Sequence, residues 1–181
     1  TFNHHDFKGK IKPELQFAEG LALCTWQDAG YGKLVYEGKE LENYFSDVLV
    51  EACVKMYQAW HLDPAPKRVT YIPSKRNPEL VANFAKRLAE KLNLRFGQVL
   101  EKVKDNESQQ NMLNSFQQVR NIDGAFEVII PTREEDNQYA PCLLIDDIVD
   151  SGWTITLTSA LLRQAGVSTV YPLVLANYTQ S

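Results

Sequence analysis

The chain has 181 residues, 44% hydrophobic and 23% charged, a composition typical of one globular domain with a sizeable core. Its net charge of −4 argues against a protein that coats nucleic-acid duplexes, and no apolar run approaches the roughly 18 residues of a membrane span, so no membrane partner is expected. Three widely spaced cysteines (Cys24, Cys53, Cys142) fit neither a zinc motif nor a disulfide framework and favour a reducing, cytoplasmic setting. A first residue of Thr rather than Met indicates a processed form or an excised fragment.

Apolar periodicity and Gly/Pro punctuation predict strands that alternate with helices. Asn77 and Pro78 have the residue types of a helix start, Gly166 that of a helix end, and Pro172 favours an edge position for the last strand. The predicted elements are a strand at 21–26, a helix at 39–60, a strand at 69–72, a helix at 78–92, a weaker strand at 96–100, a polar helix at 109–119, a strand at 125–130, an exposed acidic loop at 133–139, a strand at 142–145, a helix at 154–165 and a strand at 169–176.

This alternation predicts an α/β fold with a parallel sheet and right-handed crossovers. The run at 142–145 is continuously apolar, as expected for a strand buried on both faces. Ligands of such sheets bind beyond the carboxyl ends of the strands. Two loops leave those ends with chemically rich sequences, at 73–76 and 146–154.

The charges are unevenly distributed. Residues 67–104 hold ten Lys and Arg against three Glu, a net of +7, and residues 123–150 hold eight Asp and Glu against one Arg, a net of −7. Solvated helix faces and acidic loops are the plainer interpretation. The sharper hypothesis is an anionic ligand held by the first segment while the second binds hydroxyls or a metal.

The segment 142–154 carries the most specific chemistry, with the sequence CLLIDDIVDSGWT. An apolar strand leads into Asp146 and Asp147, and a turn rich in Gly and hydroxyl groups then opens a helix. A helix N-terminus with free N–H groups and hydroxyl donors suits a phosphate, and two ionised carboxylates suit a vicinal diol. Asp and Ser also cap helices without any ligand, but the whole string favours a ribose 5-phosphate site.

This string resembles the signature of the type I phosphoribosyltransferases, whose three-layer, parallel-sheet α/β fold the chain is therefore expected to adopt. The resemblance implies that Asp146 and Asp147 hold the ribose hydroxyls of phosphoribosyl pyrophosphate (PRPP) and that 150–154 surrounds its 5-phosphate. The residues of that phosphate turn are Asp150, Ser151, Gly152, Trp153 and Thr154. Asp150 also matches the position of an acid that faces the base in purine-type members and is the candidate catalytic residue.

The loop Ser74-Lys75-Arg76 resembles the family's pyrophosphate loop, where its cations would neutralise the departing diphosphate. Mg²⁺ is the implied cofactor, carried largely by the ligand's oxygens and reached by Asp146 or Asp147 only through water. Lys102 and Lys104 suit a mobile flap, although solvated surface charge is the favoured interpretation. The implied organisation is an N-terminal extension or hood at 1–37 and a phosphoribosyltransferase-like domain at 38–181.

Two branches of the family share further motifs with the chain. The run Leu100-Glu101-Lys102-Val103-Lys104-Asp105 and the segment 121–126 resemble the ComF-type branch. The strings at 28–32, 73–78, 114–118 and 150–154 are similar to the C-terminal phosphoribosyltransferase-like domain of bacterial RecQ-type DNA helicases. No GxxxxGK[ST] loop is present, so a helicase motor would lie outside this chain.

Three functions follow from these resemblances. The favoured one is a PRPP-binding accessory domain of a DNA-repair helicase, which leaves DNA contact through the parent protein open. The second is an active ComF-like nucleobase phosphoribosyltransferase, disfavoured because neither 1–37 nor 101–124 holds a recognisable base pocket. The third is a protein or DNA interaction module that binds no small ligand, disfavoured by the intact acidic pair and phosphate turn.

Overall fold

The computed structural model describes residues 11–103, 124–129 and 139–178. A five-stranded sheet forms its centre, in the order β1-β7-β6-β2-β3, and every neighbouring pair of strands in it is parallel. The predicted α/β fold with a parallel sheet is therefore confirmed. The strands are β1 (Leu21–Thr25), β2 (Arg68–Tyr71), β3 (Arg95–Phe96), β6 (Cys142–Val149) and β7 (Val170–Asn177).

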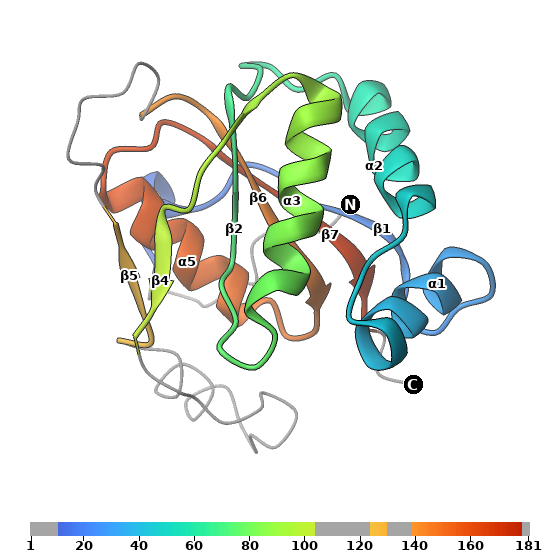
Figure 1. Ribbon diagram of the computed structural model, residues 1–181. Helices are drawn as coiled ribbons and strands as arrows, with labels where there is room; N and C mark the ends of the chain where they lie inside the picture. Colours follow the sequence, from blue (N-terminus) through green and yellow to red (C-terminus); the bar gives the residue numbers. More distant parts are fainter. Residues whose placement is uncertain (1–10, 104–123, 130–138, 179–181) are drawn as a thin grey trace.

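Helices cover both faces of this sheet (Figure 1). One face carries α2 (Asp47–Trp60) and α3 (Pro78–Leu92), and the other carries α5 (Trp153–Gln164). The remaining elements are a 3₁₀ turn η1 (Pro13–Leu15), the short helix α1 (Tyr31–Glu37), a π-helical turn η2 (Gly38–Glu42), and an antiparallel pair β4 (Leu100–Lys102) and β5 (Phe126–Val128). In the described part of the chain, every helix is too short or too polar to span a lipid bilayer.

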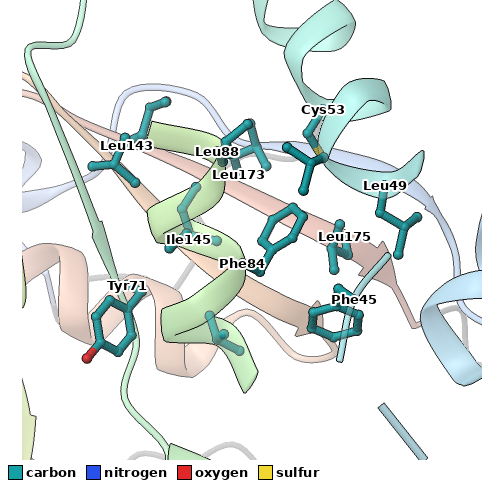
Figure 2. Close-up of a cluster of buried hydrophobic side chains, with 14 of the residues drawn as sticks. Phe45, Leu49, Cys53, Tyr71, Phe84, Leu88, Leu143, Ile145, Leu173 and Leu175 are labelled. Atoms are coloured by element: carbon teal, nitrogen blue, oxygen red, sulfur yellow. The ribbon is translucent and has the colours of Figure 1, made fainter. Parts of the chain in front are cut away.

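The strand β6 is buried on both faces, as its unbroken apolar run predicted. Leu143 and Ile145 pack into a core under α2 and α3, which Figure 2 shows together with Phe45, Phe84 and Leu173. The intervening Cys142 and Leu144 pack into a second core under α5. Since successive side chains of a strand point to opposite faces, Asp146 continues the α5 side and Asp147 continues the side of α2 and α3.

The prediction of a single helix at 39–60 is wrong, because the helix is interrupted between η2 and α2. Asn43 has a left-handed φ of 51°, which ends the π-helical turn. At Gly38 an added Cβ would lie 2.7 Å from Cδ1 of the buried Phe45, so the turn packs directly on that ring. The apolar periodicity was misleading here, since Leu41 is 71% exposed and Val48 is 55% exposed while Phe45 is fully buried.

The edge position predicted from Pro172 is also wrong, because β7 lies between β1 and β6. The carbonyl of Val170 accepts a hydrogen bond from Ala18 N–H at 3.0 Å, so the backbone polar groups of Val170 point toward the side of the sheet where β1 lies. Because these groups alternate along a strand, those of Pro172 point the same way. The β1–β7 register begins only at Leu21 and Leu173. The missing N–H of Pro172 thus falls at the start of that ladder, where it interrupts no pairing within β6–β7.

The predicted strand at 96–100 is split. Arg95 and Phe96 pair with β2 as the last strand of the main sheet, whereas Leu100 begins β4. The predicted strand at 125–130 is β5, which pairs antiparallel with β4 outside the parallel sheet. The expected polar helix at 109–119 lies outside the described residues, as do Lys104 and nearly all of the acidic loop at 133–139.

Both helix boundaries taken from Pro and Gly signals are confirmed. Helix α3 begins at Pro78, and Gly166 follows the end of α5 with a φ of 109°. The strand predicted near 21–26 is confirmed as β1, and it forms the edge of the main sheet next to β7. The division of the chain at 37/38 stays a prediction.

Candidate ligand-binding site

The turn from β6 into α5 presents a helix N-terminus to solvent. Gly152 occupies the N-cap position with a φ of 80°, a left-handed conformation that glycine adopts without steric cost. Its carbonyl accepts the first helical bond, from Thr156 N–H at 2.9 Å. The first amides of an α-helix have no partner within the helix, and they carry a partial positive charge that suits an anion. In α5 the first of them, Trp153 N–H, donates to Ser151 Oγ at 3.4 Å.

A small hollow lies directly at this turn. Its volume is about 90 Å³, against the roughly 10–15 Å³ that a single buried water requires, so it has room for a group of several heavy atoms. Its lining combines polar and apolar residues. The polar side chains are those of Asp146, Asp150, Ser151 and Thr154, and the lining is completed by Ile148, Val149, Gly152 and Ile155.

The two adjacent carboxylates differ in their partners. Asp146 accepts a hydrogen bond from Asp147 N–H at 2.9 Å through Oδ1. Asp147 accepts one from Ile148 N–H at 2.8 Å through Oδ1, and its Oδ2 accepts the ammonium of Lys39. Asp146 lines the small hollow, whereas Asp147 points to the opposite face of the sheet, where Lys39 meets it.

The environment raises the pKa of Asp146 well above its ordinary value. Burial is the largest cause, and the neighbouring Asp147 carboxylate adds to it, while the Asp147 N–H and Lys39 act in the opposite direction. Burial also raises the pKa of Asp150. Carboxyls with raised pKa beside a hollow mark a candidate functional site, since a chain folded only for stability would avoid them.

The loop after β2 reaches the same edge of the sheet. Tyr71, the last residue of β2, is in register with Ile145 of β6, so the loop after β2 begins beside the acidic pair (Figure 1). The Ser74 hydroxyl accepts a hydrogen bond from Asn77 N–H at 3.3 Å, which fixes the loop against the start of α3. Lys75 Nζ lies 3.5 Å from the carbonyl oxygen of Val103, next to β4.

A second, larger hollow of about 300 Å³ separates η2 from this loop. Two cations and one carboxylate contribute to its lining, together with amide and hydroxyl groups. The polar residues that line it are Lys39, Glu40, Asn43, Ser74, Arg76 and Asn77. The hollows are linked through Lys39, because that side chain lines the second one and bonds Asp147, which is hydrogen-bonded to Asp146 in the first.

The structure separates the sequence-predicted site residues into groups. Asp146, Asp150, Ser151, Gly152 and Thr154 meet at the small hollow. Ser74 and Arg76 meet at the large one, and Lys75 is directed to the hairpin β4–β5.

Two of the remaining candidates have packing roles. Trp153 is 3% exposed and belongs to the core under α5, so only its backbone can face a ligand. Lys102 lies over the ring of Phe126 with Nζ 5.8 Å from the centroid, a contact that does not bear on the hollows.

Sequence reasoning missed Lys39. The apolar periodicity put it at the start of a long helix, and no local signal links it to Asp147, 108 positions away. The only hint was the glycine at position 38, which allows η2 to pack tightly on Phe45.

Ion pairs with neighbouring acidic residues neutralise part of the charge of the basic segment 67–104. Arg87 pairs with Asp47 at 2.8 Å, and Lys91 pairs with Glu51 at 3.1 Å, so acids of α2 face bases of α3. Arg68 is 8% exposed within the sheet. These three cations are thus taken up by the fold, and DNA contact stays a prediction.

One family model matches the C-terminal part of the chain. Residues 82–180 match the family model of the phosphoribosyl transferase domain, a span that includes the acidic pair and the phosphate turn and excludes Lys39 and the 74–76 loop. Because this match covers more than half of the chain, the protein belongs to the phosphoribosyl transferase domain family. Its parallel sheet, covered by helices on both faces, is the fold expected of a type I member.

Among solved structures, the chain is similar to the crystal structure of adenine phosphoribosyltransferase from Leishmania tarentolae. The identity is 13%, the TM-score is 0.45, and the alignment covers 72% of this chain and 69% of that one. No curated protein matches the sequence.

Proposed function

We propose that this site binds PRPP together with Mg²⁺, with the sugar over the Asp146–Asp147 pair and an anionic group in each hollow. The observation that carries the proposal is the arrangement of the two hollows on either side of one acidic pair. PRPP has the matching pattern, since its ribose diol lies between a monophosphate at C5 and a diphosphate at C1.

The small hollow suits the 5-phosphate. Amides of the first turn of α5, the Ser151 and Thr154 hydroxyls and the left-handed Gly152 supply donors without a bulky side chain at the turn. The Trp153 side chain is directed into the core, and its amide donates to Ser151 Oγ at 3.4 Å, so its proposed part in phosphate binding is to hold that hydroxyl at the turn.

The acidic pair suits the ribose hydroxyls. Each carboxylate retains acceptor capacity beyond its backbone hydrogen bond, because an ionised oxygen has two lone pairs. The raised pKa of Asp146 means that binding a diol through this group in its ionised form becomes more favourable as pH rises.

The large hollow suits the diphosphate, and Ser74 and Arg76 line it. Lys75 belongs to the same proposed diphosphate loop on the resemblance alone, since its ammonium lies beside the carbonyl of Val103. Within residues 11–103, 124–129 and 139–178, no cluster of three or more His, Cys, Asp or Glu side chains is present to cage a metal. This donor set fits an ion carried by the ligand's own phosphate oxygens, with a carboxylate of the pair reached through water. Bound Mg²⁺ would supply neutralisation of the diphosphate charge.

The biological setting we propose is an accessory domain of a RecQ-type DNA helicase that acts in DNA repair, on the motif resemblances at 28–32, 73–78, 114–118 and 150–154. The proposed hood of residues 1–37 would be joined to the 38–181 domain through β1, which pairs with β7 in the main sheet.

The second candidate is active, ComF-like transfer to a nucleobase. It is favoured by Asp150, a partly buried carboxyl of raised pKa at the phosphate turn. In that reaction the bond from C1 to the diphosphate oxygen breaks, a base nitrogen bonds C1, pyrophosphate leaves, and Asp150 accepts the base proton.

Calorimetric titration with PRPP and Mg²⁺ tests the binding proposal. An Asp146→Asn/Asp147→Asn double variant should lose the binding heat, whereas Glu51→Gln, which alters an exposed carboxylate on α2, should bind like the original chain. Absence of heat at millimolar PRPP from folded protein would refute the proposal. Release of pyrophosphate on addition of nucleobases, abolished by Asp150→Asn, would identify the active transferase and displace the purely binding role.

A further inference from the structure

Lys39 forms an ion pair at the junction of the two hollows. Its ammonium bonds Oδ2 of Asp147, and the two side chains are only 29% and 12% exposed. An ion pair with this much shielding is screened less by solvent than an ordinary surface pair. It is thus a defined part of the site and unlike the exposed pair of Lys33 with Glu37 on α1, where the lysine side chain is 72% exposed.

The backbone holds Lys39 firmly in place. The π-helical turn that carries it packs through Gly38 on the Phe45 ring, which is fully buried against Phe84. Arg87 of α3 donates a hydrogen bond to the carbonyl of Phe45. Single π-helical turns occur frequently at functional sites, where they redirect a side chain that a regular helix would place elsewhere.

The electrostatic need for a cation at this position follows from the proposed function. A diphosphate in the large hollow would approach the Asp147 carboxylate, and two anions repel each other strongly where solvent is partly excluded. An ammonium has three donors, so it can hold Asp147 and still donate to a diphosphate oxygen. Arg76 supplies the other cation of that hollow.

We propose, on the basis of the function proposed above, that Lys39 is the residue that selects ligands bearing a diphosphate: its ammonium bridges Asp147 and the diphosphate in the large hollow. Ribose 5-phosphate, which lacks that group, gains nothing from the lysine. The structure thereby assigns Lys39 a specificity role that the matched span 82–180 does not include.

The test is calorimetric titration with three probes, each with Mg²⁺: PRPP, inorganic pyrophosphate and ribose 5-phosphate. The proteins are the original chain, Lys39→Met, Lys39→Arg and the matched control Lys33→Met, each checked by thermal denaturation. Lys39→Met should weaken PRPP and pyrophosphate about 10- to 100-fold, the range expected for one lost charge-assisted hydrogen bond. Ribose 5-phosphate should change by less than about threefold, Lys39→Arg should restore most of the loss, and Lys33→Met should alter none of the three.

The outcomes separate this inference from the proposed function. If the original chain binds PRPP and Lys39→Met weakens all three probes equally, or none, the selectivity role is refuted while PRPP binding stands. Equal weakening would mean that the lysine only holds Asp147 in place. If the folded original chain binds none of the probes, the proposed function fails, and this inference fails with it. Should Lys39→Met unfold, Lys39→Gln decides, because glutamine can still donate a hydrogen bond to Asp147 but carries no charge for the diphosphate. A fall in the ratio of PRPP to ribose 5-phosphate affinity in this variant supports the inference, and an unchanged ratio refutes it.

Discussion

Replacement of Asp146 by asparagine is expected to stabilise the protein while it removes ligand binding. Asn Oδ1 can accept the same hydrogen bond from Asp147 N–H that Asp146 accepts at 2.9 Å, so the backbone contact survives. The substitution eliminates a carboxylate whose pKa is raised by burial and by the neighbouring Asp147 carboxylate. Relief of such strained functional groups commonly adds about 0.5–2 kcal/mol to the free energy of unfolding.

Asp146 keeps some contact with solvent, which screens the repulsion, so we expect the lower half of that range, about 0.5–1 kcal/mol. For a chain of this size the corresponding rise in melting temperature is about 1–4 °C. Differential scanning calorimetry at neutral pH measures it, and PRPP titration of the same sample measures the loss of binding.

The pH dependence gives the sharper test. Because the folded pKa of Asp146 is raised, the folded state of the original chain binds this proton more tightly than the unfolded state. Its stability relative to Asp146→Asn therefore falls as pH rises from about 4, the unfolded carboxyl pKa, to the folded pKa. The variant's advantage should be present at neutral pH and should shrink as pH approaches 4.

Asp147→Asn is the matched control, because it changes the adjacent carboxylate in the same way but removes the partner of Lys39. It should lower the free energy of unfolding by about 1 kcal/mol, a change of opposite sign. A fall in melting temperature for Asp146→Asn, or a gain as large at pH 4 as at neutral pH, would refute the electrostatic account of this carboxylate.

Three further outcomes are expected. Gly152→Ala should cost about 1–2 kcal/mol by denaturant titration, because its φ of 80° is left-handed, and should also weaken PRPP binding; unchanged stability would contradict the strained turn. Trp153→Ala should cost about 3–5 kcal/mol through the cavity left under α5, and a loss below 1 kcal/mol would show that the ring is not core. Burial raises the pKa of Cys24 to about 11 and that of Cys142 to about 12. A thiol reagent at pH 8 should therefore modify the folded protein slowly, Cys24 before Cys142, and should react rapidly only after denaturation. Rapid labelling of Cys142 in the folded state would contradict its burial.

Local patterns were sufficient for several elements of this fold. The unbroken apolar run of β6 predicted burial on both faces, because alternate side chains must each meet a core. Pro78 and Gly166 marked helix ends correctly, since both act through the backbone of their own turn. The turn after β6 was predictable for the same reason: an acidic pair, a hydroxyl and a glycine are consecutive in the chain.

Elements that depend on distant contacts were not predictable in this way. The interruption between η2 and α2 follows from packing of Gly38 on Phe45, a tertiary contact that overrides the helical periodicity of the segment. Pro172 suggested an edge strand, but its missing N–H falls beside the start of β1, and only the order of the strands determines that. The hairpin β4–β5 likewise required a partner far along the chain.

The candidate site divides along the same line. By itself the sequence determined the phosphate turn and the acidic pair, because those residues are neighbours along the backbone and a local motif is enough to predict their chemistry. Only the tertiary structure decided that Asp146 lines the small hollow, and that Asp147 bonds Lys39, which lines the large hollow together with Ser74 and Arg76. An ion pair that joins residues 108 positions apart leaves no local periodicity, since its geometry is set by the packing of whole helices against the sheet.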